Sequence, residues 1–262
     1  MNLDLTGSIV LYENNPDVLL SAVNSFLETN LNVRLFIIDN SPVNSLKDIF
    51  NDNKIQYFHN PRNPGFGASH NIALKLAIEV NSPYHVVLNP DVYFNNKALN
   101  EIYDYMNSNK NIGQLMPMIC YPDGELQYLC KTNPTFFDLF IRGFIPNKFK
   151  NIFSRRLRKY QYLDQDYNEI IYDVPYLSGC FMFFRMEVIK KIGFFDENIF
   201  MYLEDADITR RVLKFSRTVY YPKVKIYHHY AGLTHKIFKF KLITIQSAIT
   251  YFNKWGWFNN LV

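Results

Sequence analysis

The sequence predicts an α/β fold in which helices cover both faces of a mostly parallel sheet. Through the N-terminal half, short apolar runs of strand length alternate with segments whose apolar residues recur at helical spacing. Turn-forming residues close the runs, as at residues 39–42 and 89–91. Because strands joined by helices of this length pair in parallel, we expect the sheet to be buried on both faces.

The first helix has the clearest local signals. A strand is predicted over residues 8–11, after which Asn15 is suited to cap a helix and Pro16 to occupy its first turn. The apolar residues that follow fall on one helical face: Leu19, Leu20, Val23, Phe26 and Leu27. The same pattern predicts strands over residues 33–38, 55–58 and 84–88, and a helix after the loop at 61–67.

The pattern changes in the second half of the chain. Residues 131–170 are rich in aromatic and basic side chains, and regular alternation returns at residues 174–184. No Gly/Ser-rich linker or internal repeat divides the sequence. We therefore expect a single domain over residues 1–262, with an insertion at 131–170 and a helical C-terminal tail.

The composition indicates a folded, cytoplasmic protein. With 48% hydrophobic and 20% charged residues among 262, the chain can bury a sizeable core. Its three cysteines lack CxxC spacing, which disfavours a zinc site or a disulfide framework and favours a reducing compartment. The N-terminus lacks a signal-peptide pattern, and no window reaches the roughly 18 uncharged apolar residues of a spanning helix. We expect at most a peripheral contact with the inner face of the cell membrane.

The net charge of +4 hides a strong asymmetry. No acidic residue follows Asp207, whereas ten Lys and Arg residues do, which points to an anionic partner such as phosphate, nucleic acid or lipid. Residues 136–159 and 235–258 interleave aromatic and basic side chains, a combination suited to the surface of an anionic membrane. The alternative is a packed core beneath a solvated basic face, and both interpretations stay open.

Three polar clusters follow predicted strands, at the edge where open α/β sheets bind ligands. Asp39 could accept hydrogen bonds from a base or a ribose hydroxyl, or it could cap its own turn. The glycines of the loop at 61–67 would let the backbone approach a phosphate, although loop glycines mostly serve turns. Pro90 stiffens the loop before Asp91, which either faces the crevice and binds a divalent cation or lies in solvent.

Two further clusters carry groups for proton transfer or metal binding. Glu204, Asp205 and Asp207 lie among Phe, Met and Tyr residues, which would raise a carboxyl pKa as a general base requires. The alternative is an acidic helix N-terminus in which Asp207 and Arg211 form a surface pair. Residues 227–230 contain two adjacent histidines, of which one would face the crevice and the other away from it.

Taken in order, these clusters resemble the family 2 glycosyltransferases of the GT-A type, especially the rhamnosyltransferase-like branch of bacterial O-antigen and capsule polysaccharide synthesis. The resemblance covers about residues 6–257. Seven motifs support it: SIVLYEN (8–14), IIDNS (37–41), NPGFGASHN (63–71), VVLNPDV (86–92), YLSGCFMFFR (176–185), IGFFDENIFMYLEDADITRR (192–211) and VKIYHHYAGLTHK (224–236). It implies one Rossmann-like domain, with a nucleotide-sugar-binding half at residues 1–120 and an acceptor-binding half at 121–262.

The resemblance also implies roles for residues on the donor side. Tyr12 and Glu13 would lie beside the nucleotide, and Asp39 would bind the base. The loop around the donor would include Asn63, Gly65 and Asn71.

The metal site implied by the resemblance departs from the family pattern. Asp91 matches the last position of the metal-binding DxD motif, but Asn89 stands at the first, so the site has one fewer negative charge. We expect Mg²⁺ or Mn²⁺ there, with weak affinity for the free ion. His228 matches the histidine that completes the metal or phosphate site, an alignment that depends on its spacing to Gly232 and Thr234.

Asp205 matches the catalytic base of the family, which implies an inverting, single-displacement transfer. The donor would be dTDP-rhamnose or a UDP-hexose, and the acceptor a hydroxyl of a glycan, expected to be lipid-linked. Two other functions are less consistent with the sequence. A nucleotidyltransferase would need a basic, Gly-rich N-terminal loop, which residues 8–17 lack, and a nucleic-acid-binding protein would show an RRM, KH or zinc-finger signature, which the sequence also lacks.

Overall fold

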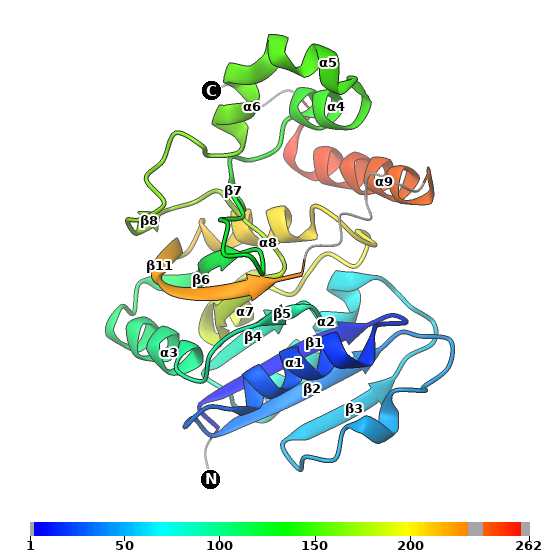
Figure 1. The fold of residues 1–262 in the computed structure, drawn as a ribbon, viewed down its shortest axis with the longest axis vertical. Helices are drawn as coiled ribbons and strands as arrows, with labels where there is room; N and C mark the ends of the chain where they lie inside the picture. The colour runs from blue at the N-terminus through cyan, green and yellow to red at the C-terminus, as the bar shows by residue number, and fades with distance from the viewer. Residues whose placement is uncertain (1–2, 230–237, 258–262) are drawn as a thin grey trace.

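The computed structural model describes residues 3–229 and 238–257 (Figure 1). Its main element is a mixed sheet in the order β3-β2-β1-β4-β10-β6-β11-β5, with β8 paired to β11 on the side. The bounds are β1 Leu5–Leu11, β2 Val33–Asp39, β3 Ile55–His59, β4 Tyr84–Leu88, β5 Val92–Tyr93, β6 Ile112–Cys120, β8 Ile171–Tyr172, β10 Phe181–Arg185 and β11 Arg217–His228.

Strand direction confirms a mostly parallel sheet. The strands β3, β2, β1 and β4 are parallel to one another, and β11 is parallel to β6. The exception at the centre is β10, which lies between β4 and β6 and is antiparallel to both. All five residues of β10 are buried, as expected for a strand with a neighbour on each side and helices on the sheet faces.

Helices cover both faces of this sheet, as predicted. On one face lie α1 (Pro16–Leu27) and α3 (Ala98–Ser108), whose apolar side chains join the larger core cluster. On the other lie α2 (Phe66–Glu79), α7 (Met186–Ile192) and α8 (Glu204–Val212), which form a second cluster. The expected cap of α1 is present, since the Asn15 side chain accepts hydrogen bonds from the backbone N–H groups of Asp17 and Val18.

A smaller unit lies beside the sheet (Figure 1). It contains a two-stranded sheet, β7 (Cys130–Lys131) with β9 (Tyr176–Leu177), and the helical elements α4 (Phe136–Phe144), α5 (Asn147–Lys150), η2 (Asn151–Phe153) and α6 (Ser154–Tyr160). The C-terminal helix α9 (Phe238–Trp255) packs with it. The remaining short element is η1 (Lys47–Ile49).

The helical tail was predicted, and its contacts are with the smaller unit and α8. Tyr251 and Phe252 of α9 are fully buried in a cluster with Leu203 and Ala206, at the start of α8, and with Leu139 of α4. The tail therefore packs over the segment that carries the acidic cluster. Among the helices in the described ranges, none combines the length and hydropathy needed to cross a bilayer.

The segment 174–184, where regular alternation returns in the sequence, does not form one continuous strand. It is divided into β9 and β10 by Ser178, Gly179 and Cys180. The backbone N–H of Gly179 donates to a side chain, Oδ2 of Asp205, and the Cys180 carbonyl accepts from Asn89 N–H in the loop after β4. These contacts interrupt the strand because they replace the regular ladder at this point.

Candidate active site

The carboxyl ends of β1 and β2 lie side by side, with Leu11 paired to Asp39. Asp39 is fully buried. Its Oδ1 accepts a 2.9 Å hydrogen bond from Ser41 N–H, and its Oδ2 accepts a 2.5 Å hydrogen bond from the Tyr57 hydroxyl. The first of these bonds is the capped turn that the sequence offered as the alternative role of Asp39. Burial and the neighbouring Asp39 carboxylate raise the pKa of Tyr57, so this phenol remains a donor at neutral pH.

Tyr12 and Glu13 form an exposed edge directly after β1. The Tyr12 side chain is 50% exposed. Glu13 has a φ of +50°, and its backbone N–H donates to Ser41 Oγ at 2.9 Å. The turns after β1 and β2 are thereby tied together.

The loop glycines before and within α2 approach the protein's own chain. Gly65 has a φ of +104°, and a Cβ there would lie 2.2 Å from the Phe200 carbonyl oxygen, which also accepts from Phe66 N–H at 2.8 Å. A Cβ on Gly67 would lie 2.8 Å from Phe195 Cβ. These glycines allow the segment 195–200 to approach closely, and their role beside a phosphate stays a prediction.

Asn63 and Asn71 flank this loop but differ in environment. Asn63 is partly buried in a turn with φ of +43°. Asn71 is buried in α2 and holds the segment 195–197: its Nδ2 donates to Phe195 O and Glu197 Oε1, both at 3.0 Å, and its Oδ1 accepts from Phe195 N–H at 2.9 Å. The amide of Asn71 is therefore directed at the chain that leads into α8.

Asn89 and Asp91 occupy the turn after β4. Asn89 is partly buried, and its backbone N–H donates to Cys180 O at 2.9 Å. Oδ1 of Asp91 is buried without a hydrogen-bond partner and lies 3.4 Å from Nε2 of His228, at the end of β11. A buried carboxylate oxygen in this situation is destabilised unless a cation or a donor satisfies it.

Gln127 fixes which nitrogen of His228 carries the proton. The Gln127 Nε2 donates to the backbone carbonyls of His228 at 2.9 Å and Cys120 at 3.4 Å, so its Oε1 is the atom that faces His228 Nδ1, at 3.0 Å. Nδ1–H must therefore donate to Gln127, which leaves a lone pair on Nε2 in the neutral ring. This lone pair and the Asp91 carboxylate face each other.

This donor set fits a divalent cation. One carboxylate oxygen and one imidazole nitrogen are suitable ligands for Mn²⁺ or Mg²⁺, and a partner such as Gln127 orients a ligating histidine. Among residues 3–229 and 238–257, no third His, Cys, Asp or Glu completes the set. The remaining positions would thus fall to water and substrate oxygens.

The structure distinguishes the two adjacent histidines. His228 is 5% exposed and turns toward Asp91, whereas His229 is exposed and stacks on Tyr93 with the ring centroids 5.1 Å apart. This is the alternation expected of neighbouring residues on a strand. Gly232 and Thr234, from which the sequence alignment was judged, lie outside the described residues.

Asp205 lies in the first turn of α8 and is 8% exposed. Its Oδ2 accepts from Gly179 N–H and its Oδ1 from Ala206 N–H, both at 2.9 Å. Burial raises the pKa of Asp205, although Lys131 and these hydrogen bonds act in the opposite direction. The raised pKa agrees with the expectation for a carboxylate set among apolar residues.

The other two acidic residues of α8 have different environments. Burial and the neighbouring Asp205 raise the pKa of Glu204 well above its usual value, and its Oε2 has no hydrogen-bond partner. Asp207 does pair with Arg211, but it is fully buried, so the expected surface position is wrong. Asp207 also accepts from Lys254 and Trp255, which makes it the anchor of α9.

The sequence patterns assign no role to two residues of this site. Gly179 lies in the motif at residues 176–185, and a Cβ there would crowd Asp205, since it would lie 3.3 Å from Asp205 Cβ. Lys131 is a single basic residue in a two-residue strand, yet its Nζ lies 4.5 Å from the Tyr176 ring, and its pKa is lowered to about 8 by burial and by Arg142. Both depend on contacts between distant segments, which local patterns do not encode.

Comparison with protein families gives one match. Residues 9–193 match the model of the family described as Glycosyl transferase family 2. An N-acetylglucosaminyl-diphospho-decaprenol L-rhamnosyltransferase of Mycobacterium tuberculosis is 29% identical over 150 residues, which cover 57% of this chain and 48% of that protein. The low-salt glycan biosynthesis hexosyltransferase Agl10 of Haloferax volcanii is 23% identical over 216 residues, which cover 79% of this chain and 61% of that protein.

Solved structures agree on the fold. GalNAc-T7, crystallised with UDP, GalNAc and Mn²⁺, matches with a TM-score of 0.63 and 14% identity over 87% of this chain and 43% of its own. S. aureus TarS matches with a TM-score of 0.59 and 15% identity over 97% of this chain and 40% of its own. The likeness confirms the GT-A fold. The chain spans only about half the length of the mycobacterial relative.

Proposed function

The chain belongs to glycosyl transferase family 2, and from this premise we propose that it transfers a sugar from a nucleotide-sugar donor to a glycan hydroxyl, with inversion at the anomeric carbon. One observation carries the proposal. The adjacent residues Gly179 and Cys180 join the two candidate centres: Gly179 N–H binds the Asp205 carboxylate, and Cys180 O binds the Asn89 N–H of the Asp91 loop. The family match also favours this function over nucleotidyl transfer and nucleic-acid binding.

On the donor side, the nucleotide would lie at the ends of β1 and β2. Tyr12 offers an exposed ring for the base, and Glu13 is held beside it by its bond to Ser41. Asp39 would accept hydrogen bonds from the base. Its two oxygens already accept from Ser41 and Tyr57, but each carboxylate oxygen can accept more than one hydrogen bond. Asn63, Gly65 and Asn71 would shape the donor loop, with Asn71 acting through the segment 195–197.

Asp91 and His228 would hold the divalent cation, with Asn89 as the neutral member of the loop. A bound Mg²⁺ or Mn²⁺ would neutralise charge that develops on the leaving diphosphate. Gln127 orients His228 so that Nε2 faces Asp91 and would be available as a ligand.

Asp205 would act on the acceptor. Its carboxylate would take the proton from the acceptor hydroxyl while that oxygen attacks the anomeric carbon from the face opposite the nucleotide. The hydrogen bonds from Gly179 and Ala206 hold the two oxygens in place and leave further lone pairs for the hydroxyl. One attack and no covalent intermediate give inversion.

The donor and acceptor are proposed from the relatives. The mycobacterial relative is named for rhamnosyl transfer to a diphospho-decaprenol-linked sugar and the haloarchaeal one for hexosyl transfer, so dTDP-rhamnose or a UDP-hexose and a lipid-linked glycan are the proposed substrates, in O-antigen or capsule synthesis. The test incubates the protein with dTDP-, UDP- and GDP-sugars and Mg²⁺ or Mn²⁺. Thermal stabilisation by one donor class, with slow hydrolysis of that donor, would support the proposal. If no donor stabilises the protein and none is hydrolysed, the proposal is overturned.

A lipid-linked acceptor would bring the protein to an anionic membrane surface on the cytoplasmic side, and the smaller unit offers a face for it. Helices α4 and α9 pack together, and part of their apolar surface is core. Other apolar side chains of the two helices are exposed. They are Phe136, Phe137 and Phe140 on α4, and Leu242, Ile245 and Ile249 on α9.

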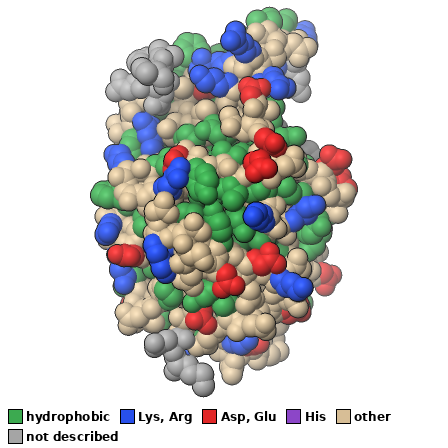
Figure 2. All heavy atoms as spheres, turned by 90° about the vertical axis from the view of Figure 1, so that its left-hand side faces the viewer, with side chains coloured by type: hydrophobic (Ala, Val, Ile, Leu, Met, Phe, Trp, Pro, Cys, Tyr) green, Lys and Arg blue, Asp and Glu red, His purple; other side chains and the backbone are tan. Residues whose placement is uncertain are grey.

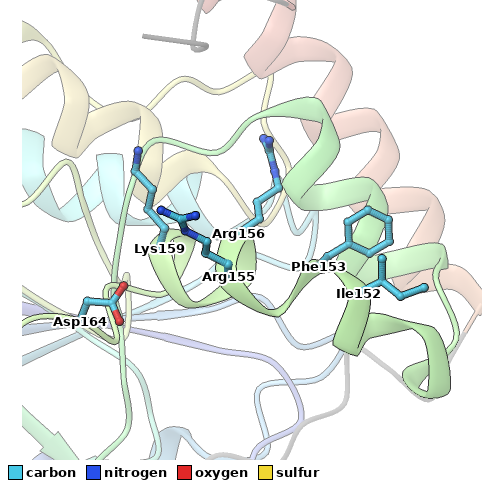
Figure 3. A pocket seen from close by; sticks show the side chains of 6 residues that line it. All are labelled: Ile152, Phe153, Arg155, Arg156, Lys159 and Asp164. Atoms are coloured by element: carbon cyan, nitrogen blue, oxygen red, sulfur yellow. The ribbon is translucent and has the colours of Figure 1, made fainter.

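Basic residues belong to the same unit, and the Arg156 guanidinium lies 5.7 Å from the centre of the Phe137 ring. Figure 2 shows Lys and Arg side chains gathered at the upper end of the molecule, which α4–α6 form in Figure 1. Figure 3 shows a pocket beside them, in which Arg155 and Lys159 extend from α6. Its lining residues are Ile152, Phe153, Arg155, Arg156, Lys159 and Asp164. Residues 235–237 and 258, also expected in this surface, lie outside the described residues.

A further inference from the structure

Resting on the proposed function, we propose that Lys131 and Arg142 bind a phosphate group of the acceptor, on the side of Asp205 away from the donor. The ligand class is a phosphate or diphosphate ester. Neither residue belongs to the donor or metal site described above.

Lys131 is held in place by its strand and by aromatic side chains. It pairs with Tyr176 across β7 and β9, and its Nζ lies 4.5 Å from the centre of the Tyr176 ring. Tyr176 itself belongs to the buried cluster that contains Leu203 and Ala206, on either side of Asp205 in the chain. The Lys131 ammonium is therefore held against the cluster that surrounds the proposed base.

Arg142 supplies a second positive charge to the same place. Its guanidinium lies 5.4 Å from the Tyr160 ring, and Tyr160 is tied to the end of β7 because its carbonyl accepts from Thr132 N–H at 3.0 Å. Arg142 is close enough to Lys131 that its charge helps burial to lower the pKa of Lys131 to about 8. Two cations are thus held near each other in the smaller unit.

The nearby carboxylate does not neutralise them. Asp205 attracts Lys131, but its oxygens already accept from Gly179 and Ala206. Within the described part of the chain, neither Lys131 nor Arg142 has a carboxylate oxygen within 4.0 Å. A phosphate would satisfy both, because it carries between one and two negative charges and several strong acceptor oxygens.

The position assigns this phosphate to the acceptor. The donor diphosphate is expected at Asp91 and His228, at the ends of β4 and β11, whereas Lys131 and Arg142 belong to β7 and α4 of the smaller unit. The acceptor hydroxyl would then meet Asp205, and its phosphate would meet the two cations of the smaller unit.

The test measures binding of farnesyl diphosphate, with farnesol and inorganic pyrophosphate as comparison probes, in EDTA so that no metal occupies the donor site. We expect farnesyl diphosphate to bind and farnesol to bind far more weakly. Lys131→Met and Arg142→Gln should each weaken diphosphate binding roughly 10- to 100-fold. Arg142→Lys should retain most of the affinity, and Lys97→Gln, which removes an exposed cation on another element, should change nothing.

The outcomes separate this proposal from the proposed function. Metal-dependent stabilisation by a nucleoside diphosphate should persist in Lys131→Met and Arg142→Gln, which also shows that they fold. If they bind nucleotide and still bind farnesyl diphosphate as the wild type does, the phosphate site is wrong while the transferase assignment stands. Equal binding of farnesol and farnesyl diphosphate would likewise overturn it. If pyrophosphate binds and its binding depends on both Lys131 and Arg142, the phosphate site is supported, but a lipid chain is not needed for binding.

Discussion

Gly179 donates its backbone N–H to Oδ2 of Asp205 at 2.9 Å, across 26 residues of sequence. A side chain at Gly179 would crowd Asp205, since a Cβ would lie 3.3 Å from the Asp205 Cβ. The next residue, Cys180, accepts from the backbone of Asn89. One short interruption between β9 and β10 therefore sets the position of the acidic residue relative to the loop that carries Asp91.

Replacing Asp205 by Asn should abolish most transfer while donor binding survives. The loss should be about 10²–10⁴-fold, because the amide cannot accept the proton of the acceptor hydroxyl. Rates of sugar transfer and nucleotide-induced thermal shifts measure the two effects. Asp173→Asn, at an exposed carboxylate paired with Arg217, is the matched control. Retention of more than about a tenth of the activity would shift the assignment to Glu204, since Asp207 is committed to Arg211 and Lys254.

Asp91→Asn should remove metal-dependent stabilisation by the nucleoside diphosphate, and EDTA should do the same to the wild type. His228→Ala should behave like Asp91→Asn, because Nε2 lies 3.4 Å from Oδ1 of Asp91. His229→Ala should resemble the wild type, since its ring stacks on Tyr93 instead. Thermal shifts with and without Mn²⁺ measure this. Full activity in EDTA would exclude the metal, and a larger effect at His229 would exclude the assignment of His228.

Gln127→Leu should weaken metal-dependent nucleotide binding by roughly 10- to 100-fold without abolishing it. The leucine cannot accept from His228 Nδ1–H, so the ring loses the contact that selects its tautomer. Titration of Mn²⁺ at fixed nucleotide gives the apparent affinity. An unchanged affinity would mean that Gln127 serves only the backbone carbonyls of Cys120 and His228.

Glu204→Gln should raise the melting temperature at neutral pH. The folded-state pKa of Glu204 lies above its unfolded value, so the folded protein keeps the proton that the unfolded chain loses. Stability from this group is fully present below the unfolded pKa and is lost as pH rises toward the folded one. Melting curves from acid to neutral pH should show a flatter profile for the variant than for the wild type. A lower melting temperature at neutral pH would show that Glu204 is held by a favourable contact.

Binding to vesicles should require anionic lipid and should decrease as salt rises to physiological levels. Replacing Arg155, Arg156, Arg158 and Lys159 with Ser should weaken it, since each engaged basic residue contributes about 1 kcal/mol. Phe137→Ser and Leu242→Ser test the apolar part, being 52% and 51% exposed. Co-sedimentation with phosphatidylserine-containing vesicles is the measurement. Equal binding to neutral vesicles, or none at low salt, would argue against the anionic surface.

The N-terminal half was predictable because its information is local. Residues a few positions apart predict the cap at Asn15, the helical face of α1 and the buried β4. The predicted strands of this half lie within three residues of the bounds in the structure. The polar clusters at strand ends were likewise readable, because parallel strands bring their carboxyl ends to one edge. The sequence thereby determined the fold class and the candidates Asp39, Asp91 and Asp205.

Tertiary structure decided how those candidates are held. Asn71 reaches Phe195 across 124 residues, Gln127 reaches His228 across 101, and Trp255 reaches Asp207 across 48. The antiparallel β10 and the meeting of Lys131 with Tyr176 are of the same kind. Such contacts form only when the chain is packed, because hydrogen bonds and charges act over a few ångströms. Hydrophobic periodicity, in contrast, can be recognised from residues that are close in sequence.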